Sequence, residues 1–107
     1  MSTMRGLARR APARLSGAVR QADELCTHLA DTPDVEATQT RGCEECLATG
    51  STWVHLRRCL SCGHVGCCDS SPRRHATAHF HATDHPVVRS AEPGESWRWC
   101  YVDELTA

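Results

Sequence analysis

The sequence predicts a small α+β domain, in which a short antiparallel or mixed sheet packs with one or two helices. Three observations predict this class. The chain has 107 residues with one Phe, one Tyr, three Trp and no Ile, so its apolar core is small. Its apolar residues alternate in some segments and follow a helical period in another. Finally, eight cysteines and seven histidines recur at short spacings.

The closely spaced Cys and His residues indicate that metal ions staple the domain. Zinc takes thiolate, imidazole and carboxylate donors, and a Cys-x2-Cys turn commonly supplies two of them. Twelve residues have suitable identities and spacings: Cys26, His28, Cys43, Cys46, Cys59, Cys62, Cys67, His75, His79, His85, Cys100 and Asp103. Because a structural zinc takes four donors, the sequence predicts three Zn²⁺ ions as cofactors, each contributing about 10 kcal/mol to folding.

The chain divides into three segments. Residues 1–25 carry five Arg and no acid before Asp23, with apolar residues at helix-like spacing, so we interpret them as an Arg-rich, partly helical arm. An organellar transit peptide, which would be richer in Ser, and an anionic-surface binder are the alternatives. Residues 26–104 form the predicted metal-binding domain, and 105–107 a tail. Within the domain, the Asp, Thr, Pro and Gly of residues 30–42 predict a polar loop.

Local patterns predict the first strand and the helix. Residues 53–57 alternate and predict a strand that enters the turn at Cys59–Gly63, where the glycine supplies the positive φ that a zinc knuckle needs. Ser71 and the following Pro72 predict the N-cap and first position of a helix over 73–82.

The second half of the domain is predicted to continue from this helix into a hairpin. On the helix, His75 and His79 are four residues apart and therefore share a face. Residues 87–89 predict a strand, the Pro-Gly pair within 92–95 a turn, and 96–102 the returning strand. Alternation puts one set of returning-strand side chains, Trp97, Trp99 and Tyr101, on one face and another set, Arg98, Cys100 and Val102, on the other.

Composition bounds the cellular setting. Arginines interrupt every apolar run in residues 1–25, so we expect neither a signal peptide nor a membrane span. A secreted disulfide framework is therefore disfavoured, and we expect a monomer in a reducing, cytoplasmic compartment. Lys, Asn and Ile are absent while Ala, Arg and Gly are plentiful, a bias expected of a high-GC bacterial genome. The formal charge of −1 gives no reason to expect nucleic acid as partner.

One ordered string of motifs runs from about Cys26 to Glu104: Cys-x-His, Cys-x2-Cys, Trp, Cys-x2-Cys-Gly, Val-Gly-Cys, His-Ala-x2-His, His-Pro and Trp-x-Trp-Cys-Tyr. This string resembles the UBP-type zinc finger, a ubiquitin-binding module of some ubiquitin-specific proteases, a cytoplasmic histone deacetylase and a ubiquitin ligase. Spacing alone would also allow a four-cysteine ribbon from the first two Cys-x2-Cys pairs. The resemblance instead implies three interleaved ligand sets: Cys43, Cys46, Cys67 and His75; Cys59, Cys62, His79 and His85; Cys26, His28, Cys100 and Asp103.

Several neighbouring residues fall outside these sets. Asp103 stands where the family often has Cys, and a carboxylate is an acceptable zinc ligand. Cys68 follows the ligand Cys67 and is expected to be a free thiol. Three further histidines match no ligand position and are expected to be exposed or hydrogen-bonded: His55, His64 and His81.

The resemblance also implies a pocket for a peptide terminus, since the family holds the C-terminal Gly-Gly of ubiquitin between aromatic walls and an Arg. Trp53, Trp99 and Tyr101 match the aromatic positions, whereas Trp97 has no counterpart and is expected in the core. Asp69, followed by a Ser, stands where ubiquitin-binding members have Arg-Tyr. Because Asp69 would repel a buried carboxylate, we do not expect ordinary ubiquitin to bind.

The sequence therefore predicts a non-catalytic zinc module that recognises a protein or peptide terminus. One alternative is a nucleic-acid-binding zinc protein that uses arginines on phosphates, namely Arg57, Arg58, Arg73, Arg74 and the arm. A less favoured alternative is a zinc hydrolase at Asp103 with Glu104 as its base, although the chain has no His-Glu-x2-His motif.

Overall fold

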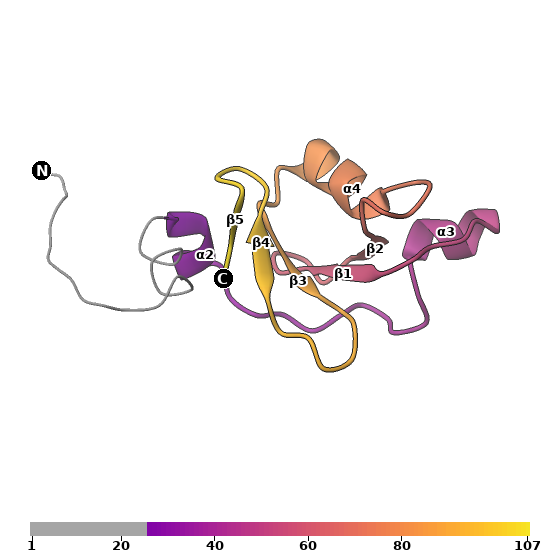
Figure 1. Cartoon of the computed structure of the whole chain (residues 1–107), viewed down its shortest axis with the longest axis horizontal. Coiled ribbons are helices and arrows are strands. Elements are labelled where there is room, and N and C mark those ends of the chain that lie inside the picture. Colours follow the sequence, from indigo (N-terminus) through magenta and orange to yellow (C-terminus); the bar gives the residue numbers. More distant parts are fainter. Residues whose placement is uncertain (1–25) are drawn as a thin grey trace, which may run out of the picture.

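The structure is a computed structural model that describes residues 26–107, so the expected arm at 1–25 lies outside the described residues. The described chain forms a five-stranded antiparallel sheet surrounded by three short helices (Figure 1). This architecture confirms the predicted α+β class. No helix in the described part of the chain is long and apolar enough to cross a membrane.

The strands are ordered β2-β1-β3-β4-β5 across the sheet. In chain order they are β1 (Leu56–Cys59), β2 (Val65–Cys67), β3 (Val87–Ser90), β4 (Arg98–Cys100) and β5 (Leu105–Thr106). The register pairs Cys59 of β1 with Val88 of β3, and Val87 of β3 with Cys100 of β4. Two cysteines that belong to different predicted zinc sites are thereby held at fixed positions across the middle of the sheet.

Each helix packs against a different part of the sheet. The helices are α2 (Thr27–Asp31), α3 (Glu44–Thr49) and α4 (His75–Thr83). Helix α4 covers β1 and β2, α3 contacts β2 at the outer edge, and α2 packs on β4 at the opposite end (Figure 1). Because the helices come from separate parts of the sequence, the sheet is the common platform that brings their side chains together.

The buried core consists largely of the predicted zinc ligands. One cluster contains Cys26, Leu29, Leu60, Val87 and Cys100, with Leu105 and Ala107 packed against it. A second cluster contains Cys43, Cys46 and Cys67, with Trp53 and Leu56 beside it. Few large apolar side chains are fully buried, so the sites replace the core that the composition cannot supply.

The helix start differs from the sequence prediction. Helix α4 begins at His75, and its N-cap is Arg74 in a left-handed conformation, not Ser71. Ser71 is instead buried, and its Oγ accepts a hydrogen bond from the Val54 N–H at 2.8 Å. The expected local cap is therefore used to hold a distant loop, which sequence pattern cannot reveal.

Other boundaries also move. The first strand begins at Leu56, three residues later than expected, and β4 ends at Cys100 because residues 101–104 form a turn in which Glu104 has φ 55°. This turn returns the chain so that residues 105–106, expected as a tail, pair with β4 as strand β5. Helices α2 and α3 occupy segments for which the sequence predicted no helix, and α2 extends into the first two residues of the predicted loop.

Candidate metal centres and the adjoining cavity

The structure brings the twelve predicted donors together in three groups. Each group contains four side chains whose donor atoms all lie within 4.8 Å of one another. The groups are site 1 (Cys43, Cys46, Cys67 and His75), site 2 (Cys59, Cys62, His79 and His85) and site 3 (Cys26, His28, Cys100 and Asp103). Sites 1 and 2 are interleaved along the sequence. The two Cys-x2-Cys pairs therefore lie in separate groups and do not form a four-cysteine ribbon.

Site 1 joins α3, β2 and α4. Cys43 precedes α3 and Cys46 lies within it, while Cys67 ends β2 and His75 begins α4. The His75 Nδ1 lies 3.3, 3.4 and 3.6 Å from the sulfurs of Cys43, Cys46 and Cys67. The His75 backbone N–H also donates to the Cys67 sulfur at 3.2 Å, which ties the start of α4 to the end of β2.

Site 2 joins the β1–β2 turn to α4 and the segment after it. The Cys59 sulfur lies 3.5 Å from His85 Nδ1, and the Cys62 sulfur lies 3.4 Å from His79 Nε2. The turn is the expected knuckle, in which Gly63 has φ 83° and donates its N–H to the Cys59 carbonyl at 2.8 Å. A side chain at Gly63 would collide with the Glu36 backbone, so this position has a steric as well as a conformational need for glycine.

Site 3 ties α2 to the end of β4. The Cys26 sulfur lies 3.9 Å from His28 Nδ1, and that nitrogen lies 3.0 Å from Asp103 Oδ2. Cys26 and Cys100 are fully buried, whereas the His28 and Asp103 side chains are 36% and 37% exposed. Site 3 is therefore a half-open site with buried sulfurs and a solvent-facing imidazole and carboxylate.

The donor geometry fits tetrahedral zinc. Zinc bonds of about 2.3 Å to sulfur and 2.0 Å to nitrogen require sulfurs about 3.8 Å apart and sulfur–nitrogen pairs about 3.5 Å apart. The observed sulfur–nitrogen distances in sites 1 and 2 run from 3.3 to 3.6 Å, and Cys46 and Cys67 are 3.9 Å apart. Site 3 is looser, since its Cys26 sulfur lies 3.9 Å from His28 Nδ1, but each of the three groups offers four donors that could hold one ion.

Burial raises the pKa of four ligand thiols, those of Cys26, Cys43, Cys46 and Cys59. Burial, reinforced by neighbouring cysteines, raises the pKa of Cys43 to about 12, and burial with the bond to Asp103 raises that of Cys26 to about 11. Burial likewise lowers the pKa of His79, helped by the nearby His64 and His85, so its imidazole is neutral and available as a ligand. A zinc ion would displace the thiol protons and compensate the clustered negative charge.

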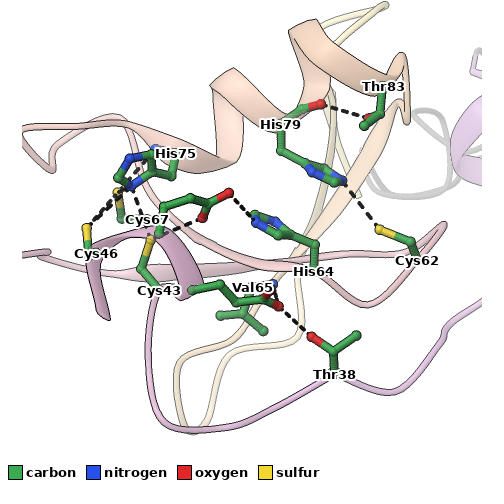
Figure 2. A network of polar contacts seen from close by, with 12 residues as sticks. Thr38, Cys43, Cys46, Cys62, His64, Val65, Cys67, His75, His79 and Thr83 are labelled. Atoms are coloured by element: carbon green, nitrogen blue, oxygen red, sulfur yellow. Dashed lines mark hydrogen bonds and ion pairs between the residues drawn. The ribbon is translucent and has the colours of Figure 1, made fainter. Parts of the chain in front are cut away.

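A polar chain connects site 1 with site 2. His64 Nε2 contacts Glu45 Oε2 at 2.7 Å, and the His64 ring stacks on the His79 ring at 4.1 Å with an interplanar angle of 4°. The other Glu45 oxygen accepts from the Cys43 thiol at 3.7 Å. In Figure 2, His64 lies between the site 1 group and the pair formed by His79 and Cys62. His64 is thus a hydrogen-bonded, partly buried neighbour of two sites, in keeping with its exclusion as a ligand.

A cavity of about 530 Å³ lies beside β4. One wall consists of three aromatic rings, Trp97, Trp99 and Tyr101. The other lining residues are Arg57, Cys68, Asp69, Ser70, Val88 and Thr106. The Phe80 ring of α4 stacks on Tyr101 with ring centroids 4.8 Å apart, which fixes one side of the aromatic wall.

The cavity residues differ in part from the expected ones. Trp99, Tyr101 and Asp69 line it, but Trp53 does not, because it packs beside site 1 and over Gly42. Trp97, expected in the core, is part of the wall. A Cβ on Gly42 would lie 2.5 Å from the Trp53 ring, so only glycine leaves room for the ring at this position.

Sequence reasoning missed Arg57 as a cavity residue. Its guanidinium lies 4.5 Å from the Trp97 ring centroid, and its Nη1 donates to the Leu56 carbonyl at 2.9 Å. The neighbouring Arg58 instead pairs with Asp34 at 2.8 Å. Strand alternation separates the two side chains, but only the sheet register shows which of them faces the aromatic wall.

Cys68 is the one cysteine among the described residues outside the three groups. It is buried at the cavity and contacts Ser71 Oγ at 3.6 Å. Burial acts to raise its pKa, but hydrogen bonds from Ser71 and from the backbone of His55, together with the Arg57 charge, leave the pKa lowered overall.

Comparisons with known proteins agree with this geometry. The sequence model of a family described as "Zn-finger in ubiquitin-hydrolases and other protein" (zf-UBP) matches residues 43–106, which contain sites 1 and 2 and half of site 3. The solution NMR structure of protein RPA1320 from Rhodopseudomonas palustris is similar with a TM-score of 0.70 and 58% sequence identity, over 76% of this chain and 78% of that chain. None of the curated proteins matches the sequence.

Proposed function

This chain belongs to the zf-UBP family of zinc fingers, and we propose that it is a non-catalytic module that receives a protein or peptide C-terminus in the cavity beside β4. The observation that carries the proposal is the cavity itself, which is lined by three aromatic rings and by the Arg57 guanidinium. Rigid rings give contact area at low entropic cost, and a guanidinium can bind a terminal carboxylate through two hydrogen bonds.

The metal sites support binding without catalysis. A catalytic zinc keeps a coordination position open for water, whereas each site here offers four protein donors. Glu104, the base that a hydrolase at site 3 would need, is exposed on the turn after β4. We therefore assign the three Zn²⁺ ions a structural role: they hold β4 and α4, which carry the aromatic wall and Phe80, in place.

The two charged residues that line the cavity limit which ligands it can bind. Arg57 supplies a cation that could hold a carboxylate, and Asp69 adds a negative charge to the lining of the same cavity. Ubiquitin-binding members of the family have an Arg at the position of Asp69. The terminal carboxylate of a ubiquitin tail would therefore be repelled at this position. We expect ordinary ubiquitin to bind weakly or not at all, and measurable micromolar binding in an NMR titration would show that Arg57 fully compensates for Asp69.

Nucleic acid is a weaker candidate partner. Arg57 and Arg58 project to different surroundings, since one stacks on Trp97 and the other pairs with Asp34. Arg73 and Arg74 are exposed near the start of α4, so these four arginines do not form one basic stripe in the described structure. A phosphate-binding role would make affinity fall steeply with salt, which a titration at two ionic strengths would reveal.

The decisive test compares a terminal carboxylate with a terminal amide. We would titrate zinc-loaded protein with two acetylated hexapeptide pools that are randomised at the last three positions, one with a free carboxylate and one amidated. The free-acid pool should bind at least about tenfold better, because a charge-assisted hydrogen bond contributes about 1.5–3 kcal/mol. Equal binding of both pools, or none at millimolar concentration, would contradict the proposal.

Two arginine variants provide the matched comparison. Arg57→Gln should abolish the preference for the free acid, whereas Arg58→Gln should keep it, because Arg58 pairs with Asp34 and does not line the cavity. Dispersed ¹H–¹⁵N spectra of both zinc-loaded variants would show that the fold is intact.

A further inference from the structure

Asp69 is the cavity feature that the proposed function leaves unused. It is an exposed residue that also lines the cavity, so its carboxylate lies at the rim. Its Oδ1 accepts a hydrogen bond from Thr77 Oγ1 at 2.6 Å, and the same hydroxyl lies 3.4 Å from the Tyr101 hydroxyl. Thr77, on α4, thus orients the carboxylate next to the aromatic wall.

The second oxygen of Asp69 is available to a ligand. Within residues 26–107, no side chain or backbone N–H donates to Oδ2, and no described cation pairs with Asp69. Arg57, the cation that lines the same cavity, already rests on Trp97 and donates to the Leu56 carbonyl. The rim therefore presents an oriented anion with free acceptor capacity.

The rings beside Asp69 also favour a positive charge. The face of an aromatic ring carries negative electrostatic potential, so an ammonium or guanidinium group near it is attracted. Trp97 has one face covered by Arg57 and Tyr101 has one face covered by Phe80, whereas no described guanidinium covers Trp99 or Tyr101. Asp69 and these two rings together offer a cation both a charged hydrogen-bond acceptor and aromatic surface.

From this arrangement we infer that the cavity selects a chain terminus that carries a basic side chain, with its cation held between Asp69 and the rings of Trp99 and Tyr101. This inference rests on the proposed function, because it assigns the terminal carboxylate to Arg57 and the basic side chain to Asp69. The two lining charges are then matched by two opposite charges on one ligand. A neutral tail would leave Asp69 unmatched and an acidic tail would be repelled.

The test uses peptides that differ by one charge. Acetylated glycine pentapeptides with a free carboxylate would carry Arg at the last, second-last or third-last position, and a matched set would carry citrulline, the neutral isostere of Arg. Affinity for the zinc-loaded full chain would be measured by tryptophan fluorescence and NMR titration. For at least one position, the Arg peptide should bind about 10- to 100-fold more tightly than its citrulline twin.

Protein variants assign that preference to a residue. Asp69→Asn should remove the difference between Arg and citrulline peptides, while Asp31→Asn, an exposed acid at the end of α2, should keep it. The wild-type comparison needs no variant, so the test survives if Asp69→Asn folds poorly. Asp69→Glu should retain part of the preference because it keeps the charge.

Failure of this inference differs from failure of the proposed function. If citrulline and Arg peptides bind equally while amidation still weakens binding, the cavity binds a peptide C-terminus without preferring a basic side chain. That result would overturn the present inference and leave the proposed function intact. If acid and amide forms bind equally but Arg exceeds citrulline, the cavity binds cations and not termini, which overturns the combined assignment. No binding of any peptide at millimolar concentration would reject both.

Discussion

Gly66 is the position at which one added methyl group should test whether the packing of β2 against α4 supports metal binding at site 1. It lies in β2 between Val65 and the ligand Cys67. A Cβ at Gly66 would lie 2.8 Å from the Ala76 backbone nitrogen, 2.9 Å from its Cα and 3.1 Å from His64 Cε1. Gly66→Ala therefore requires α4 or β2 to move.

The size of this movement can be worked out from the contacts. Taking about 3.5 Å as the closest comfortable approach of two heavy atoms, the new methyl must gain roughly 0.6 Å or more from backbone atoms that cannot rotate away. His75 precedes Ala76, so its Nδ1 would shift relative to the sulfur of Cys67. Metal sites tolerate deviations of only about 0.2 Å in bond length. We expect about 1–3 kcal/mol of destabilisation from overpacking and a zinc affinity at site 1 lowered by about 10- to 100-fold.

The assay is competitive zinc titration against a chromophoric chelator, with thermal unfolding of the same samples. Gly94→Ala is the matched control, because a Cβ there meets nothing within 4 Å although φ is 81°. That control should lower the melting temperature through local strain of about 1 kcal/mol and leave zinc affinity unchanged. Wild-type zinc affinity in Gly66→Ala would refute the proposed coupling between the β2–α4 contact and site 1.

Three further outcomes test the metal sites. Native mass spectrometry should count three zinc ions per chain. The Asp103→Ala variant should lower this count towards two while sites 1 and 2 stay filled. An unchanged count of three would show that zinc binding at site 3 does not need the carboxylate. Removal of zinc with a chelator under reducing conditions should abolish cooperative thermal unfolding and dispersed NMR resonances, because the buried core consists mainly of ligand cysteines. A retained unfolding transition would contradict a structural role for zinc. His64→Ala should weaken zinc at site 2 by about 10-fold or more through loss of the ring stacked on His79, whereas His55→Ala, an exposed control, should leave competitive zinc titrations unchanged.

Zinc chemistry explains why the donor residues could be chosen from sequence. A Cys-x2-Cys turn or an i, i+4 His pair positions two donors locally, so identity and spacing carry the signal. The structure gathers those twelve residues in three groups, with the partition that the family resemblance implied. Asp103, the least usual donor, lies 3.0 Å from His28 Nδ1.

The cavity could be predicted less well, since it depends on contacts between distant segments. Arg57 and Trp97 are forty residues apart, and only the register of β1, β3 and β4 places one over the other. The family resemblance predicts Trp53 in the pocket, yet its side chain packs against site 1. Ser71 shows the same difficulty, because its hydroxyl serves Val54 and not the adjacent helix.

Short helices were missed for a related reason. Helices α2 and α3 have five and six residues, too few to establish a periodic apolar stripe. The end signals of α3 were present, with Glu44 and Glu45 in its first turn and Gly50 in a left-handed conformation at its C-cap. These signals predict a helix only when it is also known that Cys43 and Cys46 contribute to the same site.

The interleaving of sites 1 and 2 means that this domain is not modular. The span of site 1 runs from Cys43 to His75 and that of site 2 from Cys59 to His85, so every peptide bond between Cys59 and His75 belongs to both. A proteolytic nick in this shared stretch would therefore break the chain within both centres at once. An insertion between Cys59 and His75 should therefore weaken both centres together.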